Sequence, residues 1–348
     1  MQNKKRIIYE IYFPAFCKDL QDLTNKIPYF KELGVTTLWL TPIFPSFTEH
    51  GYDTTDYFNI KKEYGTLEDF DNFVKKAHEN GLEVLLDLVL CHTSSEHKLF
   101  KDSIQGKNDC YFWSDKKLDD TWKICNDNGR YYQAKWYFTM PQLNNQSEQV
   151  RDLIKDIIKF WLIDHDVDGF RLDAIKYASG NPLAYWKWFC DEVYKIKPDC
   201  YLVGECWDTY EVSNKYAKTG MKTFNFEQAG WIKHSLNTGN PLVIKNDPKY
   251  DVNFLCNHDM SRISNSVGHD MNKLFKAVNM LFSLDGDVCI YYGDEINMGL
   301  NQDCHVEQGG YGDWKVRGKM DWHEVERQRK DPNSLFNYYK KKIKEYKK

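Results

Sequence analysis

The sequence predicts an α/β fold: a closed (β/α)8 barrel of the TIM type with a short insertion domain after its third strand. Short apolar strand-like segments alternate with helix-like segments along most of the chain, giving roughly eight strands, most of them followed by a helix. Repeated β-then-α units form parallel sheets, and eight such units close into a barrel. The competing architecture, an open doubly wound sheet, uses a glycine-rich phosphate-binding turn. No such turn occurs in this sequence.

The first part of the barrel is predicted from β-branched and apolar runs and from helical spacing. Both helices end at a glycine, Gly34 and Gly81, which is a typical C-terminal stop signal. The third strand, EVLLDLVL, is apolar almost throughout, as in a strand buried on both faces. The expected strands are residues 7–12, 36–40 and 83–90, and the expected helices are residues 19–33 and 67–80.

The alternation breaks over residues 93–145, which are polar and aromatic without a clear period. We therefore expect a small inserted domain of irregular structure there, and a barrel formed by residues 1–92 and 146–348. In the second part, strands are expected at residues 168–172, 201–204, 251–255, 288–292 and near Phe224, and helices at 148–164, 182–195, 271–284 and 334–346.

The composition is that of an ordinary globular protein, and the net charge argues against nucleic acid or membrane as a partner. The 348 residues are 42% hydrophobic and carry a net charge of −4, which gives no basic surface for nucleic acid or anionic membrane. No 18-residue apolar run and no signal peptide are visible. The ten cysteines lack paired zinc spacing, so reduced thiols and a cytoplasmic location are expected. The aromatic content of 16% fits sugar stacking or core packing equally well.

Four strand-like segments run directly into clustered polar residues. A carboxylate at the end of a buried strand is costly unless it is paired or used. Structural ion pairing explains some of them, because Arg171 could neutralise Asp87 and Asp173. Four such clusters at one rim of a barrel favour a catalytic site instead. The segments are DLVLCH (87–92), GFRLDAIKY (169–177), VGECW (203–207) and FLCNHD (254–259).

Convergent carboxylates of this kind suit glycoside hydrolysis. A retaining enzyme places a nucleophile and an acid/base about 5–5.5 Å apart. The acid needs a raised pKa, which burial or a neighbouring negative charge supplies. Trp207, two residues after Glu205, is expected to help exclude water.

These segments resemble the conserved regions of the α-amylase family of glycoside hydrolases. Three further segments resemble family signatures in the expected order, and the resemblance extends over residues 7–346. It implies that the chain acts on α-glucans or maltooligosaccharides. The three segments are GVTTLWLTPI (34–43), MPQLN (140–144) and YYGDEINMG (291–299).

The resemblance also implies roles for individual residues. Asp173 matches the nucleophile that forms the glycosyl-enzyme intermediate, and Arg171 matches the residue that orients it. Glu205 matches the general acid/base. Asp259 matches the third carboxylate, which binds sugar hydroxyls and favours the distorted ring.

A second set of matched residues is implied to contact the substrate or support the site. Tyr52 matches the aromatic platform beneath the cleaved glucose, and His92 and His258 match histidines that hold its hydroxyls. Lys176 matches a further substrate-binding position. Asp87 matches a structural partner of the catalytic arginine.

The sequence departs from the family pattern at a calcium site. Many members carry an asparagine where this chain has Cys91, and a histidine where it has Tyr177. Calcium prefers hard oxygen ligands. We therefore predict that the conserved calcium site is absent and that no other cofactor is needed. A zinc site of Cys91, Cys206 and Cys256 is the less favoured alternative to ordinary buried cysteines.

A second departure is at the C-terminus, where members usually continue into a β-sandwich domain. We expect a barrel without it, whose exposed flank a partner or self-association would cover. The expected activity is retaining hydrolysis of α-1,4-glucosidic bonds, as in α-amylases. An α-glucosidase or a transglycosylase acting on short oligosaccharides stays open, and so does a non-catalytic glucan-binding barrel.

Overall fold

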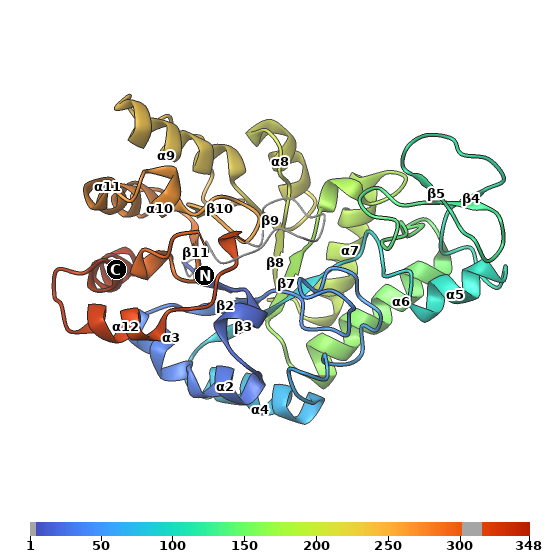
Figure 1. Ribbon diagram of the computed structural model, residues 1–348, viewed down its shortest axis with the longest axis horizontal. Coiled ribbons are helices and arrows are strands. Elements are labelled where there is room, and N and C mark those ends of the chain that lie inside the picture. The colour runs from blue at the N-terminus through green and yellow to red at the C-terminus, as the bar shows by residue number, and fades with distance from the viewer. Residues whose placement is uncertain (1–4, 301–314) are drawn as a thin grey trace.

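Eight parallel strands close into a barrel, as predicted. The computed structural model describes residues 5–300 and 315–348. The strands are hydrogen-bonded in the closed order β1-β11-β10-β9-β8-β7-β3-β2, and helices surround them (Figure 1). The strands are β1 (Ile7–Ile11), β2 (Thr37–Leu40), β3 (Glu83–Leu88), β7 (Gly169–Leu172), β8 (Tyr201–Gly204), β9 (Lys222–Phe224), β10 (Asp251–Phe254) and β11 (Asp287–Tyr291).

The helices pack their apolar faces on the outside of the barrel. At least one helix lies between each pair of successive barrel strands in the sequence, as a β-then-α repeat requires. They are α1 (Phe13–Phe16), α2 (Leu20–Asn25), α3 (Ile27–Leu33), α4 (Leu67–Glu79), α6 (Glu148–Lys159), α7 (Pro182–Ile196), α8 (Tyr210–Ala217), α9 (Phe226–Thr238), α10 (Ile263–Ser266), α11 (Met271–Leu281), α12 (Trp322–Arg329) and α13 (Leu335–Tyr346).

Some expected helices differ from the structure for identifiable reasons. The helix expected at 19–33 is divided into α2 and α3, because Pro28 has no N–H for a continuous helix and instead occupies the first turn of α3. The helix expected at 148–164 ends as a π-helical turn, Phe160–Asp164. Helices α8, α9 and α12 were not predicted. The hydrophobic residues of α9 and α12 show only weak helical periodicity.

The segment 93–145 is more regular than expected. It contains α5 (Lys98–Ile104) and a three-stranded antiparallel sheet in the order β4-β6-β5. The ring of Phe100 stacks on Trp113 at 5.6 Å and meets Tyr132 edge-on at 5.0 Å, giving the segment an aromatic core of its own. The strands are β4 (Trp113–Ser114), β5 (Trp122–Ile124) and β6 (Tyr131–Gln133).

A close approach between β7 and β8 sets the spacing of the site. A Cβ atom on Gly169 would lie 1.9 Å from the carbonyl oxygen of Tyr201, so only glycine fits there. The two strands pair in parallel from this point, with Arg171 opposite Val203. Their carboxyl ends therefore lie side by side. Within the described residues, no helix combines the length and apolar character that crossing a bilayer requires.

Candidate active site

The predicted carboxylates meet at the carboxyl end of the barrel around one guanidinium group. Arg171, in β7, donates from Nη1 to Asp87 Oδ1 at 2.8 Å and to Asp173 Oδ1 at 2.8 Å. Its Nη2 lies 2.9 Å from Glu205 Oε2. Arg171 and Asp87 are fully buried, while Asp173 and Glu205 retain slight exposure. The expected ion pairing is confirmed, and it draws Asp173 and Glu205 together.

The backbone just after Asp173 adds a second contact to Glu205. Ala174 adopts a left-handed conformation with φ 47° and ψ 46°, which residues other than glycine seldom adopt. Its N–H donates to Glu205 Oε2 at 2.9 Å. Such backbone outliers concentrate at functional sites. The turn thus fixes one oxygen of Glu205 and leaves Oε1 for other contacts.

Burial controls the protonation of the central carboxylates. It raises the pKa of Asp173 to about 6, with Arg171 opposing the rise and the charge of Asp87 adding to it. The pKa of Glu205 is also raised, first by burial and then by the charges of Asp173 and Asp259, again opposed by Arg171. A raised pKa suits a carboxyl group that donates a proton.

Asp259 has the opposite electrostatic environment. Its Oδ2 lies 3.1 Å from His258 Nε2, and its Oδ1 accepts a hydrogen bond from Arg317 Nη2 at 2.6 Å. Burial by itself would raise the pKa of Asp259, but the charges of His258 and Arg317 hold it well below its usual range. These two cations therefore favour the ionised form of Asp259.

Tyr52 links the two carboxylate environments. Its hydroxyl donates to Asp87 Oδ2 at 3.1 Å and lies 2.6 Å from His258 Nε2. The rings of Tyr52 and His258 are stacked with centroids 5.5 Å apart and planes 9° apart. These contacts hold Tyr52 beside the carboxylate cluster.

His92 and Lys176 lie at the border of the cluster. His92 is buried and its Nε2 contacts the carbonyl oxygen of Tyr52 at 2.9 Å, while its Nδ1 has no hydrogen-bond partner among the described residues. Burial lowers the pKa of His92 to about 4, which keeps the ring neutral. Lys176 pairs with Asp208 at 2.9 Å and donates to the carbonyl oxygen of Trp207 at 2.6 Å.

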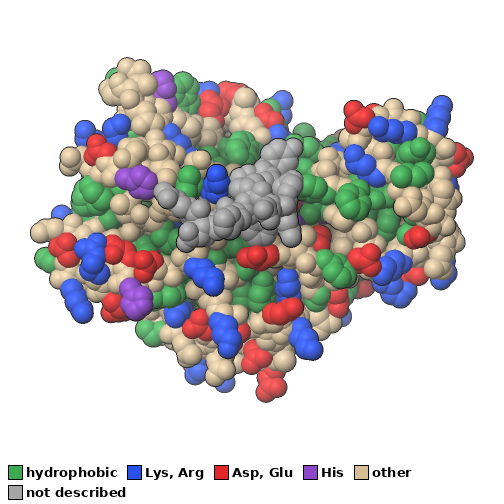
Figure 2. Space-filling view, viewed as in Figure 1, with side chains coloured by type: hydrophobic (Ala, Val, Ile, Leu, Met, Phe, Trp, Pro, Cys, Tyr) green, Lys and Arg blue, Asp and Glu red, His purple; other side chains and the backbone are tan. Residues whose placement is uncertain are grey.

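Exposed aromatic rings border the same end of the barrel. Trp136, from the insertion, is 37% exposed, and its ring centroid lies 4.9 Å from those of His92 and Tyr177. Trp207 stacks on Phe226 at 5.0 Å and is 49% exposed, so its ring is half open to water and does not seal the site. Hydrophobic side chains also gather on the insertion, at the right of Figure 2.

Three residues of this region were not predicted to belong to it. Arg317 and Trp136 lie in segments with no period, and no sequence signal marks them. Glu10 is different, because it is a charged residue within the apolar strand IIYEI. A charge in such a strand is a signal that a partner must exist.

The cysteines near the site have separate contacts. Cys91 Sγ lies 3.5 Å from the carbonyl oxygen of Ala174, and Cys256 Sγ lies 3.1 Å from Asp294 Oδ2. Within residues 5–300 and 315–348, no three histidine, cysteine or acidic side chains are arranged to hold a metal ion. The arrangement gives no support to the zinc alternative.

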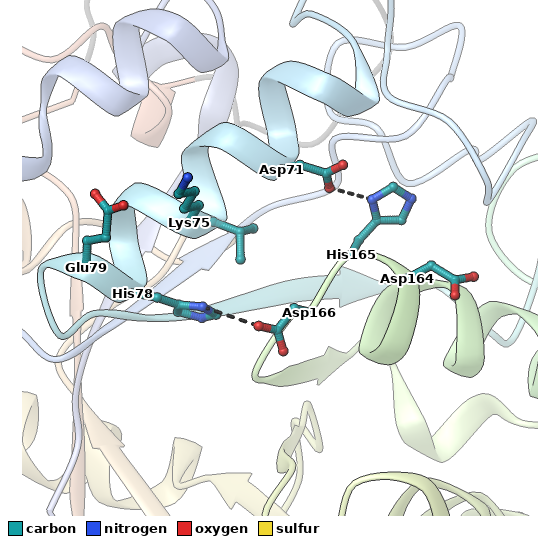
Figure 3. A pocket seen from close by; sticks show the side chains of 8 residues that line it. Asp71, Lys75, His78, Glu79, Asp164, His165 and Asp166 are labelled. Carbon is teal, nitrogen blue, oxygen red and sulfur yellow. Dashed lines mark hydrogen bonds and ion pairs between the residues drawn. The ribbon is translucent and has the colours of Figure 1, made fainter.

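A separate cleft of about 510 Å³ lies between α4 and the π-helical turn (Figure 3). Two contacts cross it: His165 Nδ1 to Asp71 Oδ1 at 2.6 Å, and His78 Nδ1 to Asp166 Oδ2 at 3.6 Å. Residues 164–166 precede β7, so the cleft is at the amino end of the strands and is not part of the carboxylate cluster.

Known proteins share both the sequence and the fold. Residues 15–324 match the family model described as the catalytic domain of alpha amylase. Alpha-amylase 3 of Dictyoglomus thermophilum is 37% identical over 97% of this chain and 76% of its own length. A 4-alpha-glucanotransferase of Thermotoga maritima is 29% identical over 95% of this chain and 84% of its own.

A solved structure agrees. Amy13B of Eubacterium rectale superposes with a TM-score of 0.85 at 30% identity, covering 99% of this chain and 79% of that one. Fold, ordered motifs and family model point to one assignment. The chain belongs to the α-amylase family of glycoside hydrolases.

Proposed function

We propose that this enzyme hydrolyses α-1,4-glucosidic bonds of starch-type glucans and maltodextrins with retention of configuration. The observation that carries the proposal is the pair Asp173 and Glu205 on one guanidinium group. Glu205 protonates the leaving oxygen while Asp173 attacks the anomeric carbon. Glu205 then takes a proton from a water molecule whose oxygen attacks the anomeric carbon, which breaks the bond to Asp173 and releases the sugar. Because both carboxylates contact the same guanidinium group, this arrangement favours the close carboxylate spacing of retaining enzymes. Inverting enzymes separate the two carboxyl groups by about 6.5–9.5 Å.

The surrounding residues are assigned by the same proposal. The ionised Asp259 accepts hydrogen bonds from sugar hydroxyls, and the face of Tyr52 lies beneath the glucose ring. His92 offers its unpaired Nδ1 to a hydroxyl hydrogen, and His258 supports Asp259. Lys176 contacts a neighbouring sugar unit. Each of these roles is a proposal for substrate binding.

Product analysis on a maltooligosaccharide ladder tests the proposal. We expect maltose and longer products, released first as α-anomers in proton NMR. Glucose as the sole product would identify an α-glucosidase instead. β-Anomers would contradict retention, and binding without any turnover would identify a glucan-binding barrel.

Transglycosylation is the second candidate activity. It uses the same glycosyl-enzyme intermediate, with a sugar hydroxyl in place of water. The similarity to a 4-alpha-glucanotransferase supports transglycosylation as an alternative to hydrolysis. Products longer than the starting oligosaccharide would establish it.

Trp136→Ala is expected to raise KM for maltodextrins and leave kcat nearly unchanged. Burying an aromatic face contributes about 1–2 kcal/mol, so KM should rise roughly 5- to 30-fold. Such binding is equal in ground and transition states, and its loss appears in KM alone. Trp231→Ala is the matched control, because Trp231 contacts His234 within the outer helix α9. Equal KM values for the two variants would contradict a substrate contact at Trp136.

Chelation of calcium is expected to change neither the activity nor the melting temperature. The residues do not fit the ion: Cys91 replaces an oxygen ligand, and burial raises the pKa of its thiol well above the usual range. The side chain of Asn145 instead connects the segments after β3 and β7. Its Nδ2 donates to Leu90 O at 2.9 Å, and its Oδ1 accepts from the Ser179 backbone N–H at 2.8 Å. Activity lost in EDTA and restored by added calcium would contradict this.

The proposal also places the enzyme in the cytoplasm. The cysteines between Cys17 and Cys289 are buried and form no disulfide in the described residues. Reduced thiols are usual in that compartment. Fractionation of the producing cells, with activity in the soluble lysate, is the expected result.

A further inference from the structure

A buried carboxylate outside the cluster around Arg171 lies on the first strand. Glu10 has no exposed surface and sits near the carboxyl end of β1, between β2 and β11. Transferring a carboxylate from water to such a place is unfavourable unless hydrogen bonds compensate it. The hydrogen-bond partners of the Glu10 carboxylate therefore indicate its role.

Within the described residues, both hydrogen bonds of the Glu10 carboxylate go to one residue, His258. Oε1 accepts from His258 Nδ1 at 2.6 Å and from the His258 backbone N–H at 3.2 Å. Oε2 has no hydrogen-bond partner among the described residues. His258 has no exposed surface either. The pair is therefore shielded from water, where an electrostatic interaction is strongest.

The other ring nitrogen of His258 faces the substrate side of the site. Nε2 lies 3.1 Å from Asp259 Oδ2 and 2.6 Å from the hydroxyl of Tyr52. One imidazole ring thus lies between two carboxylates, with Glu10 at Nδ1 and Asp259 at Nε2. A neutral ring has only one N–H and could not donate to both. An imidazolium donates at both nitrogens.

We propose that Glu10 is a positioning residue that keeps His258 protonated, so that its Nε2–H is held toward Asp259 and Tyr52 during turnover. The protonated ring fixes Asp259 in its ionised form. It also leaves the hydroxyl hydrogen of Tyr52 free to donate to Asp87. This inference rests on the proposed function only for its kinetic consequence, since the protonation of His258 is measurable without substrate.

The groups around His258 agree with this charge. Burial would lower the pKa of His258, but the carboxylates of Asp259 and Glu10 raise it to about 10. Several ionisable groups face the His258 ring from the surrounding elements. Arg317 is one of them, and its Nε donates to His258 O at 2.9 Å. The others are Glu10 from β1, His50 and Tyr52 after β2, Asp87 from β3, and Asp259 after β10. Three carboxylates outnumber one arginine and a histidine, His50, whose pKa burial lowers to about 4.

Glu10→Gln is the test, because glutamine keeps the shape and the acceptor oxygen but removes the charge. Loss of an adjacent opposite charge lowers the pKa of a histidine by about 1–3 units. The basic limb of kcat/KM, which loss of the Glu205 proton also limits, should therefore move to lower pH by no more than this fall in the pKa of His258. The acidic limb should stay in place. A purely structural role would lower activity without moving either limb.

Nitrogen-15 NMR of His258 gives the second readout. In the wild type we expect both ring nitrogens protonated from pH 6 to about pH 9. In Glu10→Gln the ring should titrate within that range. A neutral His258 in the wild type at pH 7 would overturn the proposal, and this measurement needs neither substrate nor a folded variant. If maltodextrin is not cleaved at all, the proposed function is wrong, but the NMR measurement still tests whether His258 is protonated.

Glu295→Gln is the matched control. Glu295 is equally buried, and its carboxylate accepts hydrogen bonds from Tyr9 and Tyr29 instead of from His258. It should lose stability to a similar degree with an unchanged pH profile. Equal shifts of the basic limb in both variants would overturn the role assigned to Glu10.

Discussion

Asp173→Asn is expected to abolish turnover while leaving the fold intact. The amide is too weak a nucleophile to attack the anomeric carbon, so kcat should fall by roughly 10⁴-fold or more. The side chain keeps its size, and Arg171 keeps Asp87 and Glu205 as partners. Circular dichroism and the melting temperature should match the wild type. Initial rates on maltodextrin measure the effect.

A buried aspartate at the opposite end of the barrel provides the control. Asp287 begins β11, and it accepts hydrogen bonds from the Arg6 backbone at 2.8 Å and from Tyr201 Oη at 2.7 Å. Asp287→Asn should lose some stability and keep full activity per folded molecule. Residual turnover above about one per cent in a verified Asp173→Asn preparation would exclude Asp173 as the nucleophile.

Arg171→Leu is expected to destabilise the protein more than any other change at the site. It leaves Asp87, Asp173 and Glu205 buried together without their shared counterion. Removing one member of a buried ion-pair network costs about 3–5 kcal/mol of unfolding free energy. Activity should be lost as well, because the carboxylates repel one another out of position. Urea unfolding followed by tryptophan fluorescence measures the loss.

The pH dependence separates charge from packing in this variant. Without Arg171 the carboxyl pKa values rise further above their unfolded values, so the folded state binds more protons than the unfolded state. Stability of that kind is present at low pH and is lost as pH rises. The deficit relative to the wild type should therefore be smaller at pH 5 than at pH 7. A deficit independent of pH would attribute the loss to the cavity alone.

The sequence was sufficient for the barrel and for the residues that meet around Arg171. Parallel strands bring their carboxyl ends to one rim, so polar residues following β3, β7, β8 and β10 had to converge. This argument does not predict Arg317 or Trp136, because both come from segments without periodicity. Their positions depend on how the loops fold over the rim of the barrel. The helix α9 was missed because its apolar residues show little helical periodicity.

The regular core of the insertion was missed for a similar reason. Its strands have only two or three residues each, too few for an alternating pattern to show. Its order comes from the contact of Phe100 with Trp113 and Tyr132, which is a tertiary property. Glu10 could have been found, since a lone charge in an apolar strand calls for a partner, but its partner is 248 residues away.

The closure of the barrel between β1 and β11 has a consequence for how activity arises during folding. Ile7 pairs with Val288, so the first and last barrel strands join only after the chain has been made through β11. Long-range pairing of this kind is slow, because a large loop must be closed before any contact compensates its entropy. A chain in which this seam of the barrel has not closed would lack the contact of Glu10 with His258. We therefore expect catalytic competence only after the first and last strands of the barrel have paired.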